Sequence, residues 1–460
     1  MDAKRQKTQL ELALDRKREG EAPPRPREGT EAVTAGGRTE SPAGPEHLME
    51  EVCGRRNLWA ALERVQANKG SPGVDGMTVE KLPHYLKEHW PAIRAQLLAG
   101  TYRPQPVKRV EIPKPDGGVR KLGIPTVLDR FIQQAIMQVL QERWDGTFSE
   151  HSYGFRPNRS AHEAVARAQE YISEGCGWVV DIDLEKFFDR VNHDLLMSRV
   201  AKRVTDKRLL TLIRAFLNAG VMEHGLVSPT DEGTPQGGPL SPLLSNLMLD
   251  DLDRELQQRG LRFVRYADDC NIYVRSRRAG QRVMESVSAF LTNELKLRIN
   301  KEKSAVAQPR ERKFLGFSFT QGRQPKRRVA PKALSRLKER TRELTQRTRG
   351  VSLELLMKQL GRYLRGWRAY FGYCQTPSVL ATLDQWIRRR LRLFVWKQWK
   401  RGPRRFAELR QRGVGRDLAA QTAGSSHGPW HLSKSPALSI ALPDQFFASM
   451  GLPRLMPRPA

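Results

Sequence analysis

The segment LRFVRYADDCNIYVRS, residues 261–276, decides the fold that this sequence encodes. Two runs rich in β-branched and aromatic residues flank Asp268 and Asp269, a pattern typical of a β-hairpin with carboxylates at its turn. Aspartate favours turns for local reasons, so this pair alone would indicate only an ordinary hairpin. The surrounding sequence decides between the two interpretations.

A second acidic pattern lies upstream in GWVVDIDLEKFFDRV, residues 177–191. Its apolar start predicts a buried strand that leads into a turn. Asp181 and Asp183 are separated by one residue, so a strand would project both carboxylates from the same face. A solvated strand end or a salt bridge is the alternative explanation for Asp181.

Three or four carboxylates brought together without matching cations would repel one another strongly. A divalent cation resolves that conflict, and oxygen-only ligands favour Mg²⁺, with Mn²⁺ as the alternative. Two such ions about 3.5–4 Å apart are the usual apparatus of in-line nucleotidyl transfer. The acidic segments therefore suggest nucleotidyl transfer as a hypothesis.

The positive charge of the chain is concentrated near its C-terminal end. The 460 residues include 80 Lys and Arg against 50 Asp and Glu, a net charge of +30. Residues 323–416 hold 27 of these basic residues against 5 acidic ones, together with four of the nine tryptophans. Arginine interleaved with aromatic residues suits phosphate contacts and base stacking, which predicts a nucleic-acid partner. A helical domain with a solvated basic face and an aromatic core is compatible with the same pattern.

The predicted elements divide the chain into an α+β domain and a helical domain. Residues 1–46 are polar and rich in Pro and Gly, and we expect them to be disordered. A helix over 127–144 follows RVEIPKPDGGVRKLGIP, residues 109–125, whose PDGG predicts a hairpin turn. Apolar spacings of three and four predict helices from 331 to 399. We therefore expect an α+β domain at 47–320, a basic helical domain at 321–416 and a tail at 417–460.

The compartment is suggested by what the sequence lacks. The four cysteines stand far apart without a CxxC pair, which argues against a zinc ribbon and a disulfide framework and fits a reducing cytoplasm. The sequence has neither a signal-like start nor an apolar run long enough to span a membrane. We therefore expect a cytoplasmic protein with no membrane partner.

Four motifs in order resemble those of reverse transcriptases. YADD, residues 266–269, resembles the YxDD box, and DLEKFFD, residues 183–189, resembles the first aspartate motif. GTPQGGPLSPLLSN, residues 233–246, is similar to the PQG motif, and FLGF, residues 314–317, to the last motif of the domain. The ordered set is far more specific than any single motif. It implies a right-hand polymerase with fingers and palm, followed by a helical thumb.

The resemblance implies three catalytic, metal-binding aspartates: Asp183, Asp268 and Asp269. Asp183 is preferred to Asp181 because the family has an aromatic steric gate five residues further on. That position is Phe188, whereas counting from Asp181 would reach Lys186. A flat ring under the sugar leaves no room for a 2′-hydroxyl, although one of Phe187 and Phe188 should face the core. Whether Asp181 also contacts metal stays open.

The resemblance also implies a set of contacts with the incoming nucleotide: Lys114, Arg120, Phe188, Gln236 and Lys303. Lys114 and Arg120 would clamp the triphosphate, a bidentate task that suits arginine, although a solvated basic hairpin is the alternative. Gln236 belongs to the motif that supports the nascent base pair. Lys303 matches a lysine proposed to protonate pyrophosphate, with Lys301 as the other register.

Further segments resemble the proteins encoded by bacterial group II introns. NKGSPGVDG, residues 68–76, and SYGFRPNRS, residues 152–160, match motifs of that group, and residues 362–374 and 386–400 resemble its maturase domain. The resemblance implies contacts with RNA or template–primer from six arginines: Arg362, Arg365, Arg368, Arg388, Arg389 and Arg392. The tail resembles that of the subclass without an HNH endonuclease and is a candidate DNA-binding region.

These observations lead us to expect an RNA-directed DNA polymerase that binds its group II intron RNA as a maturase, promotes splicing and supports intron mobility. Its partners would be the intron RNA, an RNA template with a DNA primer, target DNA and deoxynucleoside triphosphates. The alternatives are a reverse transcriptase repurposed for defence or diversity generation and an RNA-binding splicing factor without polymerase activity. An unrelated basic RNA-binding protein is a third, which the ordered motifs make the weakest.

Overall fold

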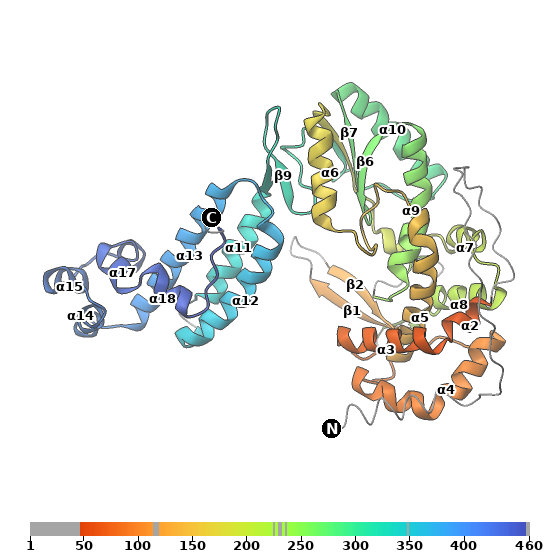
Figure 1. Ribbon diagram of the computed structural model, residues 1–460, viewed down its shortest axis with the longest axis horizontal. Helices are drawn as coiled ribbons and strands as arrows, with labels where there is room; N and C mark the ends of the chain where they lie inside the picture. The colour runs from red at the N-terminus through yellow and green to blue at the C-terminus, as the bar shows by residue number, and fades with distance from the viewer. Residues whose placement is uncertain are drawn as a thin grey trace, which may run out of the picture. The chain divides into compact units, whose positions relative to one another are not determined.

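The computed structural model describes residues 47–113, 119–223, 226–228, 232–234, 237–346 and 349–456 (Figure 1). They form two compact units. The first takes in the described residues up to Ser160 together with 180–272 and 278–306, and the second takes in 161–179, 273–277 and the described residues from 307 onward. Each unit is built around its own helices.

The first unit contains α-helices and a small sheet. Its α-helices are α2 (Leu48–Val52), α3 (Arg55–Asn68), α4 (Leu82–Ala99), α5 (Val127–Trp144), α7 (His193–Ala201), α8 (Lys207–Leu217) and α9 (Ser241–Gln258), with α10 (Arg277–Asn293) belonging to it from Arg278. Short 3-10 turns are η1 (Val79–Lys81), η2 (Asp145–Thr147) and η3 (Phe187–Asp189). The structure confirms the predicted helix over 127–144, which is α5 and is buried along most of its length.

The first of the two four-stranded sheets has the order β2-β1-β4-β5. Its strands are β1 (Val107–Pro113), β2 (Val119–Ile124), β4 (Val221–Glu223) and β5 (Leu226–Ser228). β1 and β2 pair antiparallel from Lys108 opposite Ile124 to Pro113 opposite Val119, as the predicted hairpin requires. The turn itself, residues 114–118, lies outside the described residues. β1 also pairs parallel with β4, so the hairpin belongs to a larger sheet.

The second sheet carries the acidic segments and has the order β6-β7-β3-β8. Its strands are β3 (Trp178–Ile182), β6 (Arg262–Tyr266), β7 (Asp269–Val274) and β8 (Ala305–Ala307). β6 and β7 form the predicted hairpin, and its connection places Ala267 at a φ of 58°, in the left-handed region. β7 and β3 are neighbours, so the two acidic segments lie side by side in one sheet.

The second unit is mainly helical. It contains α6 (Ala161–Ser173), the hairpin of β9 (Phe317–Phe319) and β10 (Arg327–Val329), and the long helices α11 (Pro331–Leu344), α12 (Leu353–Phe371) and α13 (Pro377–Gln398). Shorter helices follow: α14 (Gly402–Gln411), α15 (Arg416–Ala423), α16 (Pro429–Leu432), α17 (Pro436–Ala441) and α18 (Asp444–Ser449). The helices expected between 331 and 399 are therefore present.

The C-terminal segment packs into the same core as the long helices. Leu438 and Phe447 are fully buried in one cluster with Trp396 of α13. Asp384 of α13 ties the end of the segment down, because its carboxylate accepts hydrogen bonds from the Leu455 and Met456 amides at 3.0–3.1 Å. In the part of the chain that the structure describes, no helix is both long and apolar enough to cross a membrane.

Candidate active site

The three aspartates expected to act together lie at one end of the second sheet. Asp268 is in the turn between β6 and β7, Asp269 begins β7, and Asp183 directly follows β3, the strand next to β7. Residues 266–269 are called the acidic turn from here on. Asp183 and Asp268 are half-buried and Asp269 is exposed, so the group is open to solvent on one side.

The electrostatics of the site show that the carboxylates interact. Burial raises the pKa of Asp268, and the nearby charge of Asp183 raises that pKa further. Arg120 of β2 opposes this shift as a nearby positive charge. Two carboxylates that repel each other in a half-buried place form a site that a cation would stabilise.

Backbone hydrogen bonds position Asp183 after its strand ends. Its amide donates to Ser304 Oγ at 3.0 Å, and its carbonyl accepts from the Asn300 amide at 2.9 Å. The segment 300–304 also brings Lys303 to the site, where its Nζ lies 3.8 Å from Asp183 Oδ2. Lys301 is exposed two residues earlier. The sequence did not indicate Ser304, because a lone serine in a loop carries no recognisable signal.

Asp181 has a different environment from Asp183. With its amide turned so that the nitrogen faces β3, Asn271 of β7 donates to Asp181 Oδ1 at 2.9 Å. Asn271 is buried and Asp181 is half-buried, so this hydrogen bond links side chains of the neighbouring strands β7 and β3. Asp181 therefore has a structural partner on the neighbouring strand.

The two phenylalanines of the first aspartate motif face different surroundings. Phe187 is buried, with 3% of its surface exposed, whereas Phe188 is only half-buried. Their rings meet edge to face at 5.3 Å. The Thr234 amide donates to the Phe188 carbonyl at 2.6 Å, which fixes the backbone at this position.

The other residues expected to contact nucleotide are only partly described. Arg120 lies exposed on β2 and acts electrostatically on Asp268, as noted above. Lys114 and Gln236 fall outside the described residues. Just after Gln236, a Cβ on Gly237 would come within 2.6 Å of the Gly123 carbonyl oxygen. Gly237 therefore packs closely against the backbone of β2 near its end.

The six arginines expected to contact RNA divide into two sets. Arg362, Arg365 and Arg368 are exposed on α12, where Arg365 also donates to the Gly451 carbonyl at 3.2 Å. The three on α13 are engaged within the unit. Arg388 is buried beside Asp384 and Asp444, Arg392 bonds Asp444, and Arg389 stacks on Trp430 at 3.8 Å.

Asp183 and the acidic turn are the candidate ligands for a metal ion. Within the described ranges, no group of three or more His, Cys, Asp and Glu side chains is arranged to hold a metal ion. The donors that meet at the acidic turn are nevertheless all carboxylate oxygens, the ligands that Mg²⁺ and Mn²⁺ prefer. The repulsion that raises the pKa of Asp268 is what a divalent cation would relieve, so the residues fit such an ion.

Comparisons with known proteins give two family matches. Residues 112–319 match the family "Reverse transcriptase (RNA-dependent DNA polymerase)", and residues 334–413 match "Group II intron, maturase-specific domain". Protein YkfC of Escherichia coli (strain K12) is 35% identical over 281 residues, which cover 52% of this chain and 74% of YkfC. Group II intron-encoded protein LtrA of Lactococcus lactis subsp. cremoris is 36% identical over 208 residues, which cover 45% of this chain and 34% of LtrA.

A sheet with two aspartates at a hairpin turn near a third, in a chain that also has a basic helical unit, fits the class of enzymes that carry out metal-assisted phosphoryl transfer, which includes nucleic-acid polymerases. The chain belongs to the reverse transcriptases that carry a group II intron maturase-specific domain. The resemblance and the α+β fold inferred from sequence are thereby confirmed. Reverse transcriptase domains generally use divalent metal ions. The part of the chain that aligns with LtrA covers about a third of the length of that relative.

Proposed function

We propose that this chain is an RNA-directed DNA polymerase whose catalytic, metal-binding residues are Asp183, Asp268 and Asp269. One observation carries the proposal: Asp183 directly follows β3, the strand next to β7, and its charge raises the pKa of Asp268, which supports one shared site for the carboxylates. Bound Mg²⁺, or Mn²⁺ in its place, would neutralise the carboxylates, activate the primer 3′-hydroxyl and polarise the triphosphate.

The protein's own side chains would bind and orient the substrates. Arg120, with Lys114, binds the triphosphate of the incoming deoxynucleotide, and its position near Asp268 supports this role. Phe188, the less buried of the two phenylalanines, lies under the sugar and rejects a 2′-hydroxyl. Gln236 supports the nascent base pair. The Lys303 ammonium beside Asp183 gives a proton to the leaving pyrophosphate.

The helical unit supplies the maturase function in this proposal. We assign residues 47–320 to fingers and palm, 321–416 to the thumb and maturase domain, and 417–460 to a region that contacts target DNA. Exposed Arg362, Arg365 and Arg368 bind phosphates of the group II intron RNA and of the template–primer. Binding stabilises the folded ribozyme, so that the RNA splices, and the protein later copies the intron from a primer at the target site. The protein works in the cytoplasm.

Primer extension tests the polymerase half of this proposal. The full chain should extend a DNA primer on an RNA template with Mg²⁺ and deoxynucleotides, and Asp268→Ala should remove detectable extension because it removes a metal ligand. Asp189→Asn is the matched control, since Asp189 is an exposed carboxylate in nearby η3. Equal extension by wild type and Asp268→Ala would refute the catalytic assignment.

Splicing of an intron precursor tests the maturase half. A precursor carrying a group II intron should splice faster at low Mg²⁺ with the protein than without it, because the bound protein substitutes for cations that fold the RNA. Asp268→Ala serves as the control, since it should still promote splicing. Equal rates with and without protein would remove the maturase role and leave the polymerase proposal intact.

A further inference from the structure

A fully buried arginine lies directly before the acidic turn. Arg265 of β6 has 0% of its surface exposed and forms a two-pronged ion pair with Asp253 of α9, which is also 0% exposed. Arg265 Nε donates to Asp253 Oδ1 at 2.7 Å and Nη2 donates to Oδ2 at 2.6 Å. The pair joins the strand to the helix, but it uses only part of the guanidinium.

The other donors of Arg265 reach the acidic turn and two further segments. Nη1 donates to the Ala267 carbonyl at 2.9 Å and to Asn246 Oδ1 at 3.1 Å, and Nη2 donates to Ser152 Oγ at 2.8 Å. Ala267 has a φ of 58°, which residues with a side chain adopt only when their surroundings hold them there. The guanidinium thus fixes the residue that directly precedes Asp268.

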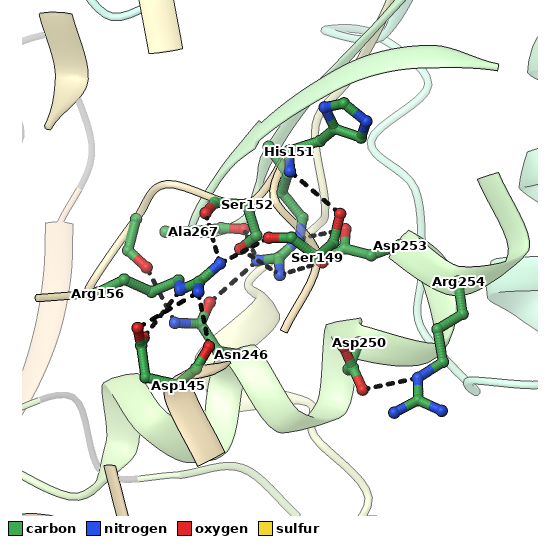
Figure 2. Close-up of polar contacts among 12 residues, drawn as sticks. Asp145, Ser149, His151, Ser152, Arg156, Asn246, Asp250, Asp253, Arg254 and Ala267 are labelled. Atoms are coloured by element: carbon green, nitrogen blue, oxygen red, sulfur yellow. Dashed lines mark hydrogen bonds and ion pairs between the residues drawn. The ribbon is translucent and has the colours of Figure 1, made fainter. Parts of the chain in front are cut away.

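Residues 152–154 also pack against this turn. A Cβ on Gly154 would lie 2.2 Å from the Ala267 nitrogen, so only glycine fits here without a shift. Asn246 donates to the Gly154 carbonyl at 2.9 Å, and the Tyr153 amide donates to the Arg265 carbonyl at 2.9 Å. Figure 2 shows Ser152, Asn246, Asp253 and Ala267 drawn together in this network. These residues open the SYGFRPNRS motif, to which the polymerase mechanism above gives no role.

We propose that Arg265 is a positioning residue of the polymerase site: it clamps the acidic turn to α9 and to residues 152–154. The clamp holds Asp268 and Asp269 in the arrangement that binds the divalent metal. Metal ligands tolerate displacements of only a fraction of an ångström, and groups that orient them alter metal affinity and rate. The inference deepens the proposed function and rests on it.

If Arg265 had a purely structural role, it would only hold β6 to α9 through the ion pair with Asp253, and it would not affect the metal ligands. The double variant Arg265→Met/Asp253→Leu separates the two roles, because an apolar pair of similar volume often keeps a fold as stable as the buried ion pair did. It removes the donors to Ala267, Asn246 and Ser152 without leaving a buried charge. Arg265→Lys is the second variant: its ammonium stays opposite Asp253 but cannot reproduce the fork that reaches the turn.

A neighbouring ion pair, between Arg203 and Asp250 of α9, gives the matched control. Arg203 Nη2 lies 2.7 Å from Asp250 Oδ2, and Asp250 is buried three residues before Asp253. Arg203 also donates to Thr147 Oγ1 at 2.7 Å, and Asp250 also accepts from Arg254 at 3.0 Å, and both of these partners lie outside the acidic turn. Arg203→Met should therefore lower the melting temperature and leave metal binding and the rate per folded molecule unchanged.

The experiment measures Mn²⁺ binding to the full chain by electron paramagnetic resonance, single-turnover deoxynucleotide incorporation, and the Kd for template–primer. We expect Arg265→Met/Asp253→Leu to stay folded with a lower melting temperature, because three buried acceptors lose their donor, to bind Mn²⁺ at least about tenfold more weakly, and to incorporate nucleotide at least about tenfold more slowly. The Kd for template–primer should stay the same. Arg265→Lys should lose Mn²⁺ affinity and rate in the same direction, which decides the matter if the double variant does not fold.

The inference would be overturned if a folded Arg265 variant kept the Mn²⁺ affinity and the incorporation rate of wild type. It would also be overturned if Arg203→Met lost as much Mn²⁺ affinity and rate as the Arg265 variants. Failure of the proposed function gives a different result. In that case wild type would not extend primers at all, while Mn²⁺ binding would still weaken when Arg265 is replaced.

Discussion

At the scale of single residues, Phe187 and Phe188 differ in a way that the sequence alone did not settle. Both are candidates for the side chain under the sugar, because they are adjacent and aromatic. Phe187 is buried and contributes to the core, whereas Phe188 keeps part of its ring accessible. The accessible ring is the one able to touch a substrate.

Replacement of Phe188 should therefore change sugar selectivity more than stability. We expect Phe188→Ala to lower the preference for deoxynucleotides over ribonucleotides by about tenfold or more, because the space for a 2′-hydroxyl opens. Competitive incorporation of the two nucleotides on one template measures this ratio. Phe187→Ala is the control and should lower the free energy of unfolding by about 3–5 kcal/mol without a selective effect on sugar choice. Unchanged selectivity in Phe188→Ala would exclude it as the gate.

The sequence predicts the three aspartates as a group, but it does not indicate the residues that surround them. Asp183, Asp268 and Asp269 stand in short local patterns with recognisable spacing. Arg265 donates a hydrogen bond to Ser152, which is 113 residues away in the chain, so these partners meet only once the protein has folded. A charged residue inside a strand gave no local sign that it would be fully buried.

At the scale of secondary-structure elements, the beginning of α8 depends on a carboxylate cluster. Asp206 caps the helix and also accepts from the Met49 amide at 3.1 Å. Arg208 joins Asp206 to Glu50 of α2 through hydrogen bonds of 2.7–2.9 Å. Arg208 lowers the pKa of Glu50. Burial raises that of Asp206, but hydrogen bonds from Arg208 and Met49 outweigh this and lower it overall.

This cluster should make the first unit sensitive to acid. Both carboxyl pKa values are lower in the folded protein, so their stabilisation is complete above the ordinary carboxyl range and is lost as the pH falls through the folded values. We expect Arg208→Met to lower the free energy of unfolding by about 1–2 kcal/mol at pH 7, allowing for solvent at Glu50, and to flatten the decline from pH 6 to pH 3. Urea unfolding at each pH measures both effects. Parallel curves for the variant and wild type would contradict this account.

At the scale of whole helices, neighbouring arginines of the basic stretch have different surroundings. The apolar side chains that recur every three or four residues in α12 and α13 form the core of the second unit, as the spacing predicted. Trp396 is fully buried there. The direction in which each arginine points depends on the C-terminal segment, which supplies Asp444 to Arg388 and Arg392 from more than 50 residues away. The charge pattern therefore predicted an RNA-binding unit but not which arginines are free to bind.

At the scale of the whole molecule, the net charge of +30 implies strongly salt-dependent RNA binding. If α12 supplies phosphate contacts, the triple variant Arg362→Gln, Arg365→Gln, Arg368→Gln should reduce the slope of log K against log salt by about 2. Filter binding of intron RNA between low and moderate salt measures this slope.

Exposed arginines outside the basic segment 323–416 provide the control for that experiment. Arg275→Gln, Arg278→Gln and Arg282→Gln remove the same charge from residues at and beside α10. Their slope should stay closer to that of wild type, because only general attraction is lost. Equal reductions in both triple variants would mean that α12 makes no special contact with the RNA.

The identity of the third catalytic aspartate is the central claim, and two residues of one strand segment offer the most direct test. The charge of Asp183 acts on Asp268 of the acidic turn, whereas the Asp181 carboxylate accepts a hydrogen bond from Asn271 of the neighbouring strand. Primer extension on an RNA template should be measured with Asp183→Asn and Asp181→Asn side by side, each checked for folding. The account predicts no detectable extension with Asp183→Asn and extension within about tenfold of wild type with Asp181→Asn. Primer extension by Asp183→Asn would contradict the account, whether or not Asp181→Asn also loses extension.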